Sequence, residues 1–270
     1  MAFHLFSQPA GRTVIGMLHV PALPGSPNYR GDWRNVQETV FEDADVLASE
    51  GVDALMLENF GDQPFFKGRV PHSTSAYMAV LAAEVNRRLR LPLGLNVLRN
   101  DGQTALAVAA ATGASFVRVN VLTGARLTDQ CVIEGIAAEL QRTRALLQAR
   151  HVKVLADVDV KHSAPLAPLP LEVEVDDTLK RGQADGLIVS GTGTGKPTDL
   201  EKLKRVKAVA RAAGGTVPVL VGSGVTTANV QAMLAVADGV IVGTSLKKDG
   251  DVFAPVDPLR VRELLKAARG

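Results

Sequence analysis

Three charged side chains alternate with small apolar residues in the segment 157–161. Asp157, Asp159 and Lys161 are separated by Val158 and Val160. Because successive side chains of a strand point to opposite faces, the apolar set should face covering helices and the charged set a barrel interior. Carboxylates beside a lysine can transfer a proton next to a carbonyl group, which is the chemistry that this pattern favours.

The same alternation brings further polar side chains to this interior. Flanking valines turn Arg118 and Asn120 inward. Other polar residues that end apolar runs are His19, Glu58 and Asn96. An interior that served the fold alone would be filled by Val, Ile and Leu. Alternatively, these side chains form ion pairs that serve only the fold, Arg118 with Asp157 and Lys161 with Glu58. The position of the charged residues at the carboxyl ends of the strands favours a functional site.

Two other chemistries stay open for these groups. A divalent cation could take oxygen ligands from Glu58, Asp157 and Asp159 and an imidazole from His19 or His162. Lys161 could form a Schiff base if its neighbours lower its pKa. Acid–base chemistry requires no cofactor, so we expect none, with a divalent cation as the second option.

Two glycine-containing turns end apolar runs near the end of the chain. Their sequences are Val221-Gly222-Ser223-Gly224-Val225 and Ile241-Val242-Gly243-Thr244-Ser245. Glycine lets the backbone approach an anion, and free N–H groups at the start of a following helix supply donors. Two successive turns of this kind are typical of the phosphate site after strands 7 and 8 of a (β/α)8 barrel. The alternative is a pair of ordinary turns.

A third glycine-rich segment imitates a nucleotide-binding P-loop. The P-loop requires Gly, four residues, and then Gly-Lys-Ser/Thr. The segment 190–197 has Ser190 at the first position and Pro197 after Lys196, so it fails at both ends. We interpret it as a loop that wraps a phosphate or a sugar hydroxyl, with Ser190, Gly191 and Lys196 as candidate contacts.

Strands and helices must alternate along the chain to position these residues. We expect strands at Thr13–His19, Ala54–Glu58, Pro92–Val97, Phe116–Val121, Val152–Val160, Gly186–Ser190, Val217–Gly222 and Gly239–Gly243. We expect helices at Val36–Ser49, Ser75–Arg88, Gln103–Ala111, Val132–Ala149, Glu172–Gly182, Leu200–Ala213, Ala228–Val236 and Pro258–Ala268. Eight such units predict one closed (β/α)8 TIM barrel of the α/β class, a single domain over residues 1–270. The long strand-to-helix loops 20–35 and 59–74 mark its working face.

Composition excludes several other classes of protein. The 270 residues carry 30 Lys+Arg against 28 Asp+Glu, a balance that indicates no nucleic-acid partner. The single Cys131 excludes an internal disulfide. No apolar run approaches the roughly 20 residues of a membrane span, and the first residues lack signal-peptide features. We therefore expect a cytoplasmic protein without a transmembrane segment.

Several motifs, in order along nearly the whole chain, resemble the BtpA/SgcQ family. They are the segments 15–25, 57–60, 96–101, 118–124, 155–162, 222–224 and 245–247. The resemblance implies a phosphate-binding (β/α)8 barrel. One branch of the family is named for photosystem I biogenesis in cyanobacteria, and another lies among sugar-utilisation genes. Asp159 departs from the apolar residue expected in the photosystem branch, which weakens transfer of the photosynthetic role.

These observations predict an enzyme that acts on a small phosphorylated metabolite, a sugar or nucleoside phosphate. Its chemistry would be that of an isomerase, epimerase or lyase. The candidate catalytic residues are His19, Glu58, Asp157, Asp159 and Lys161. The candidate substrate-binding residues are Asn96, Arg118, Asn120, His162, Ser190, Gly191, Gly222, Ser223, Gly224, Gly243, Thr244 and Ser245.

Two hypotheses in which the protein is not an enzyme remain. One is an assembly or stability factor of the photosystem type with a peripheral membrane contact, for which Phe3-His4-Leu5-Phe6 is the docking candidate. The other is a sensor that binds a phosphorylated ligand without turnover. A homo-oligomer is compatible with all three.

Overall fold

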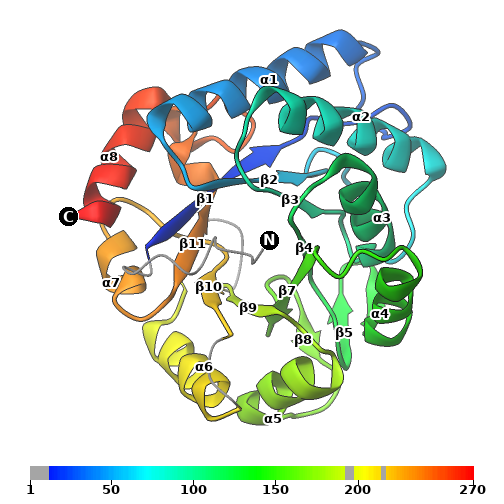
Figure 1. Ribbon diagram of the computed structural model, residues 1–270, viewed down its shortest axis with the longest axis vertical. Coiled ribbons are helices and arrows are strands. Elements are labelled where there is room, and N and C mark those ends of the chain that lie inside the picture. Colours follow the sequence, from blue (N-terminus) through cyan, green and yellow to red (C-terminus); the bar gives the residue numbers. More distant parts are fainter. Residues whose placement is uncertain (1–11, 192–197, 214–216) are drawn as a thin grey trace.

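Eight parallel strands close into a barrel, and the helices form a ring around it (Figure 1). The computed structural model describes residues 12–191, 198–213 and 217–270. The strands follow one another around the barrel in the order β1-β11-β10-β9-β7-β4-β3-β2. This closed parallel order confirms the predicted (β/α)8 fold.

The barrel strands are β1 (Thr13–His19), β2 (Ala54–Glu58), β3 (Leu93–Asn96), β4 (Phe116–Val119), β7 (Lys153–Val158), β9 (Gly186–Val189), β10 (Val219–Val221) and β11 (Gly239–Val242). The α-helices are α1 (Trp33–Glu50), α2 (His72–Arg88), α3 (Gly102–Thr112), α4 (Ala137–Leu146), α5 (Leu171–Asp176), α6 (Leu200–Ala212), α7 (Val230–Leu234) and α8 (Pro258–Arg269). A π-helical turn, η2 (Asp177–Arg181), continues α5.

Local capping explains where several helices begin and end. The side chains of Asp32, Asp101, Asp199 and Asp257 accept hydrogen bonds from backbone N–H groups in the first turns of α1, α3, α6 and α8. Aspartate is a favoured N-cap because its carboxylate pairs with amides that have no partner inside the helix. Gly51 ends α1 with a φ of 92°, a backbone conformation that glycine adopts without steric cost.

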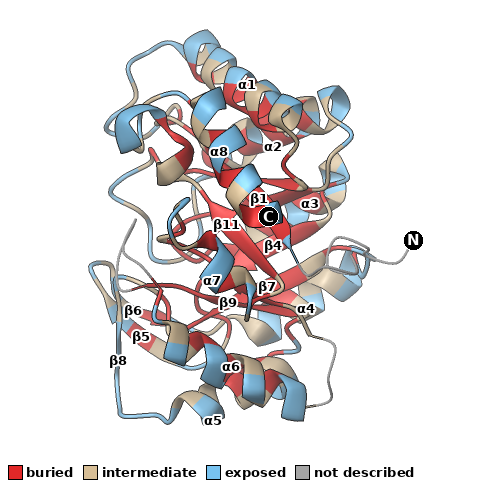
Figure 2. Ribbon diagram, turned by 90° about the vertical axis from the view of Figure 1, so that its left-hand side faces the viewer, coloured by how far each residue is buried: buried red, intermediate tan, exposed pale blue. Residues whose placement is uncertain are grey.

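The strands bury both faces, as Figure 2 shows by their red colour. The outward side chains of β7 are Val154, Ala156 and Val158, which pack with the helices as their spacing predicts. The inward apolar side chains form a separate cluster: Ile15, Met17, Ala54, Met56, Phe116, Leu155, Ile188, Leu220 and Ile241. The polar layer of the site lies next to this apolar cluster, at the carboxyl ends of the strands.

A small antiparallel sheet beside the barrel is missing from the sequence prediction. Its strands are β6 (Cys131–Glu134), β5 (Ala125–Thr128) and β8 (Ala164–Pro165), in that order. The predicted helix 132–149 is therefore wrong in its first part, since α4 begins at Ala137. Ile133 of β6 packs with Val121 and Val160 in a cluster of its own, and this long-range contact outweighs the local helical pattern.

The last two helices lie where the sequence predicts them. The helix after β10 is shorter than the predicted 228–236 and covers Val230–Leu234. After β11, two 3-10 turns, η3 (Thr244–Leu246) and η4 (Lys248–Gly250), precede the last α-helix. That helix begins at Pro258, as predicted.

Two predicted contacts, Phe3-His4-Leu5-Phe6 and Lys196, lie outside the described residues. Within the described ranges, every helix is too short or too polar to cross a membrane.

Candidate functional site

One layer of inward positions at the carboxyl ends of the barrel strands is polar or glycine. The layer consists of His19, Glu58, Asn96, Arg118, Asp157, Ser190, Gly222 and Gly243. The register of the sheet places His19 opposite Glu58, and Glu58 opposite Asn96. The period-2 pattern of the strands predicted His19, Glu58, Asn96, Arg118 and Asp157 in this layer. The other three members were expected in the glycine-rich turns and loop at the strand ends.

Arg118 and Asp157 form a buried ion pair at the centre of this layer. The Nε and Nη2 groups of Arg118 each donate to one oxygen of Asp157 at 2.8 Å. Asn120 Nδ2 donates to the same carboxylate at 2.8 Å and Ser190 Oγ at 3.1 Å. Burial lowers the pKa of Arg118, but the carboxylate outweighs burial and holds this pKa above its ordinary value. Asp157 is thus fully hydrogen-bonded, and the ion pair with Arg118 that the structural alternative predicted is present.

Lys161 does not form the ion pair with Glu58 that the structural alternative predicts. Among the described residues, its ammonium group forms no ion pair, with Glu58 or with any other carboxylate. Burial, and then the charge of Arg118, lower the pKa of Lys161. Arg99 holds the backbone here, since its Nη2 donates to the Lys161 carbonyl at 2.6 Å. A half-buried lysine without a counter-ion among the described residues is suited to accept a proton or to bind an anion.

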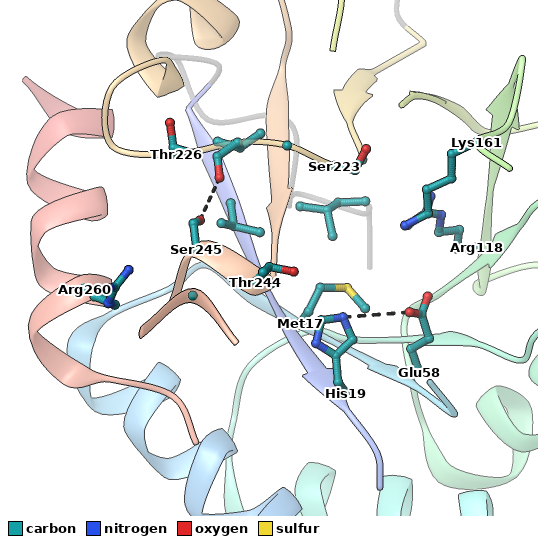
Figure 3. Close-up of a pocket in the computed structure, with 17 residues that line it drawn as sticks. Met17, His19, Glu58, Arg118, Lys161, Ser223, Thr226, Thr244, Ser245 and Arg260 are labelled. Carbon is teal, nitrogen blue, oxygen red and sulfur yellow. Dashed lines mark hydrogen bonds and ion pairs between the residues drawn. The ribbon is translucent and has the colours of Figure 1, made fainter. Parts of the chain in front are cut away.

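His19 lies beside Glu58 as a neutral imidazole. Its Nε2 is 3.9 Å from Glu58 Oε1, and its side chain is 9% exposed. Burial, followed by the charges of Lys247 and Lys161, lowers the pKa of His19 to about 3. Its Nδ1 is buried without a hydrogen-bond partner in the described part of the chain. Figure 3 shows the His19 ring directed toward Glu58, with Arg118 and Lys161 next to Glu58 at the right of the view.

The structure turns Asp159 away from this interior, so its expected position is wrong. β7 ends at Val158, and the φ of Asp159 is 49°, which breaks the strand alternation. Asp159 forms ion pairs with Arg126 and, at 2.7 Å, with Lys202, and its side chain is 45% exposed. Desolvation raises the pKa of Asp159, but the two cations outweigh it and lower this pKa. Lys161 reaches the site through the loop and not through the strand.

The two glycine turns line a cavity of about 290 Å³ (Figure 3). A Cβ on Gly222 would lie 2.4 Å from Ile188, and one on Gly243 would lie 2.5 Å from the His19 ring. Ser245 Oγ donates to the Val225 carbonyl at 2.7 Å and joins the two turns. The backbone N–H groups of four residues in these turns donate to no acceptor among the described residues: Ser223, Gly224, Thr244 and Ser245. These free donors are what an anion needs.

A second cavity of about 700 Å³ adjoins the first. Glu58, Arg118 and Lys161 line both cavities, so the two are parts of one site. The remaining lining residues of the second cavity are Asn28, Phe60, Gln63, Pro64, Phe65, Leu98, Arg99, Asn120, Asp129 and His162.

The other predicted binding residues lie at or behind these walls. Ser190 and Gly191 are buried beside the glycine turns, and the Gly191 N–H donates to Ser223 Oγ at 3.1 Å. Asn96 lines neither cavity; its Nδ2 donates to Asn120 Oδ1 at 3.4 Å. Asn96 therefore contacts the site through Asn120.

Sequence reasoning missed several lining residues. Arg99 and Asp129 come from loops, where strand alternation gives no signal, whereas the loop 59–74 with Phe65 was expected on the working face. Arg260 of α8 lines the first cavity, far in sequence from the glycine turns. The resemblance motif 96–101 contained Arg99, and this was the one available hint.

The carboxylates considered for a divalent cation are not gathered at one point. Asp157 is occupied by Arg118, and Asp159 points elsewhere. Among the described residues, no group of three His, Cys, Asp or Glu side chains has a geometry that could hold a metal ion.

Comparison with known proteins places the chain in a family. The model of the BtpA family matches residues 10–270. The photosystem I biogenesis protein BtpA of Synechocystis is 44% identical over 254 residues, which cover 94% of this chain and 87% of that protein. An uncharacterized protein of Thermococcus kodakarensis is 45% identical, covering 96% of this chain and 95% of its own.

Solved structures with the same fold are far more distant in sequence. The N-(5'-phosphoribosyl)anthranilate isomerase of Pyrococcus furiosus superposes with a TM-score of 0.57 at 16% identity, covering 95% of this chain and 98% of that one. At this identity the likeness establishes the barrel fold and nothing finer.

Proposed function

Because the chain belongs to the BtpA family and folds as the barrel described above, we propose that it is a cytoplasmic enzyme that acts on a small phosphorylated metabolite, a sugar or nucleoside phosphate. One observation carries the proposal: the same cavity is lined by backbone N–H groups without an acceptor and by a half-buried lysine without a counter-ion, as far as the described part of the chain shows. The isomerase from Pyrococcus furiosus that shares the barrel fold is named for a phosphoribosyl compound, and this name supports the proposal further.

The phosphate group is bound by the two glycine turns. The N–H groups of Ser223, Gly224, Thr244 and Ser245 supply donors, and Gly222 and Gly243 let the turns pack directly against Ile188 and the His19 ring. Arg260 on the same wall adds a positive charge. Backbone donors fixed by the fold bind an anion without the loss of side-chain entropy that a flexible lysine would incur.

Lys161, Glu58 and His19 do the acid–base chemistry. The lowered pKa of Lys161 brings its neutral form closer to physiological pH, where it can accept a proton. Glu58 lines both cavities and is the one carboxylate of the layer without a guanidinium partner among the described residues. Neutral His19 can donate or accept a hydrogen bond to a reacting oxygen without a charge of its own.

Asp157 has a positioning role in this scheme. Its oxygens are occupied by Arg118, Asn120 and Ser190, so it orients the first two against the substrate. Asp159, which the strand pattern placed with the catalytic groups, holds the turn before Lys161 through Arg126 and Lys202. Its effect on catalysis is therefore indirect.

The test begins with binding. Isothermal titration of the purified protein with ribose 5-phosphate and with inorganic phosphate measures the Kd of the anion site. Thr244→Asp adds a negative charge beside the bound phosphate and should weaken binding more than tenfold, because like charges about 4 Å apart repel by several kcal/mol at a protein surface. Thr244→Val is the matched control, since it keeps the size and the backbone N–H and should bind as the wild type does. Equal binding by all three proteins would refute the phosphate site.

Turnover separates an enzyme from a sensor. Phosphorus NMR of candidate phosphate esters incubated with the wild type should show product, and Lys161→Met should abolish it. Lys153→Met changes a lysine at the opposite end of β7 and should leave turnover intact. Binding without any product across sugar and nucleoside phosphates would instead favour a sensor.

The name of the Synechocystis relative favours a second candidate, a factor for photosystem I biogenesis that contacts a membrane complex. Such a factor should sediment with membranes at moderate salt. The enzyme should remain in the supernatant.

A further inference from the structure

The second cavity is larger than a compact sugar phosphate requires. The phosphate cavity has a volume of about 290 Å³, and the adjoining one about 700 Å³. Pockets for small organic ligands span about 300 to 1,000 Å³, so the second cavity alone can hold a substantial molecular group. The residues shared by the two cavities, Glu58, Arg118 and Lys161, lie between the phosphate site and this group.

One wall of the second cavity is apolar and partly aromatic. Phe60 and Phe65 come from the loop after β2, and Leu98 from the end of β3. The Phe60 ring is held between the rings of His19, at 4.8 Å, and Phe253, at 5.8 Å. A fixed aromatic wall binds a planar ring by stacking, whatever the pattern of substituents on that ring.

The other walls carry hydrogen-bonding groups of both kinds. Asn28 and Gln63 offer amide donors and acceptors, and Asp129 offers acceptors. Asn28 is anchored, because its Nδ2 donates to the Gln63 carbonyl at 2.9 Å. This mixture matches a heteroaromatic ring, whose edge presents donors and acceptors side by side. The carboxylates of Glu58 and Asp129 disfavour a second phosphate in this cavity, although Arg99 and Lys161 line it as well.

We infer that the substrate is a nucleoside monophosphate or a close analogue, with a planar heteroaromatic ring attached to the sugar phosphate. The ring occupies the second cavity against Phe60 and Phe65, and the phosphate occupies the glycine turns. The pentose then lies beside Glu58 and Lys161. The inference rests on the proposed function, since it names the substrate class of the same site.

The test compares ligands that differ only in the ring. Isothermal titration measures the Kd of ribose 5-phosphate, AMP and UMP for the wild type, Phe65→Ala and Phe66→Ala. The nucleotides should bind the wild type at least tenfold more tightly than ribose 5-phosphate. Phe65→Ala should remove about tenfold of nucleotide affinity and leave the Kd of ribose 5-phosphate unchanged. Phe66→Ala is the matched control, because this neighbour is 57% exposed and lies outside the second cavity.

The outcomes separate this inference from the proposed function. Equal affinity for ribose 5-phosphate and the nucleotides would overturn the ring site while leaving the phosphate site intact. Equal loss of nucleotide affinity in Phe65→Ala and Phe66→Ala would also overturn it. If no phosphate ester binds at all, the proposed function fails, and the inference fails with it.

Discussion

Replacing Asp157 by asparagine should test how the polar layer is held together. The substitution keeps the shape of the side chain but removes the charge and turns an acceptor into a donor. Arg118 would then be left with a side chain only 2% exposed and without its counter-ion. Asp159→Asn is a matched comparison two residues away, because the strand pattern treats both aspartates alike and the structure does not.

The expected magnitudes follow from the two environments. Breaking a buried ion pair by removing one partner costs about 3 to 5 kcal/mol, since the remaining charge stays desolvated. Asp159 is 45% exposed, and a partly exposed pair is worth about 1 kcal/mol or less. For 270 residues the unfolding entropy makes each kcal/mol equal to about 2 °C in Tm. Asp157→Asn should thus lower the Tm by about 5 to 9 °C, and Asp159→Asn by about 2 °C.

Differential scanning calorimetry at pH 7 measures both shifts. Should Asp157→Asn fail to fold, the double variant Arg118→Met/Asp157→Leu provides the test, because it leaves no unpaired charge and should be more stable than the single variant. Equal Tm values for Asp157→Asn and Asp159→Asn would refute the reasoning. So would a double variant less stable than Asp157→Asn.

Two further perturbations test buried groups near the site. The folded pKa of His19, about 3, lies below the unfolded value of 6.5, so the unfolded state binds more protons between these values. The free energy of unfolding of the wild type should therefore fall by up to about 1.4 kcal/mol per pH unit as the pH falls from 6.5 toward 3. Urea unfolding should show a shallower loss in His19→Gln. Identical pH profiles for the two proteins would contradict this prediction. Lys247→Met leaves Asp43 buried without its ion-pair partner and should cost about 3 to 5 kcal/mol in urea unfolding at pH 7. A loss below about 1 kcal/mol would show that the pair does not stabilise the fold.

The barrel and much of the polar layer could be predicted from the sequence. Strand alternation is a local property with a period of two, so it assigns His19, Glu58, Arg118 and Asp157 to the interior as long as the strand continues. The glycine turns were predicted from another local pattern, since each apolar run stops at a glycine followed by small hydroxyl residues. The resemblance to the BtpA/SgcQ family rested on these same segments, and the family model confirms it.

The tertiary structure decided where this local rule stops. Asp159 follows the alternating pattern in sequence, yet Arg126 of β5 and Lys202 of α6 hold it outside the barrel. These partners lie more than 30 residues away, so no local pattern reports them. The strand β6 likewise exists because Ile133 packs against Val121 and Val160.

The same distinction separates the predicted site from the observed one. Types and spacing of residues placed Asp157 and Lys161 in one interior. Only the folded geometry shows the first fully paired and the second without a counter-ion among the residues that the structure describes. The second cavity takes its walls from loops such as those of Phe65 and Asp129, whose positions depend on long-range packing. The sequence by itself determined which groups could meet, since that depends on strand periodicity. The fold decided which of them are free to react, since that depends on every neighbour in three dimensions.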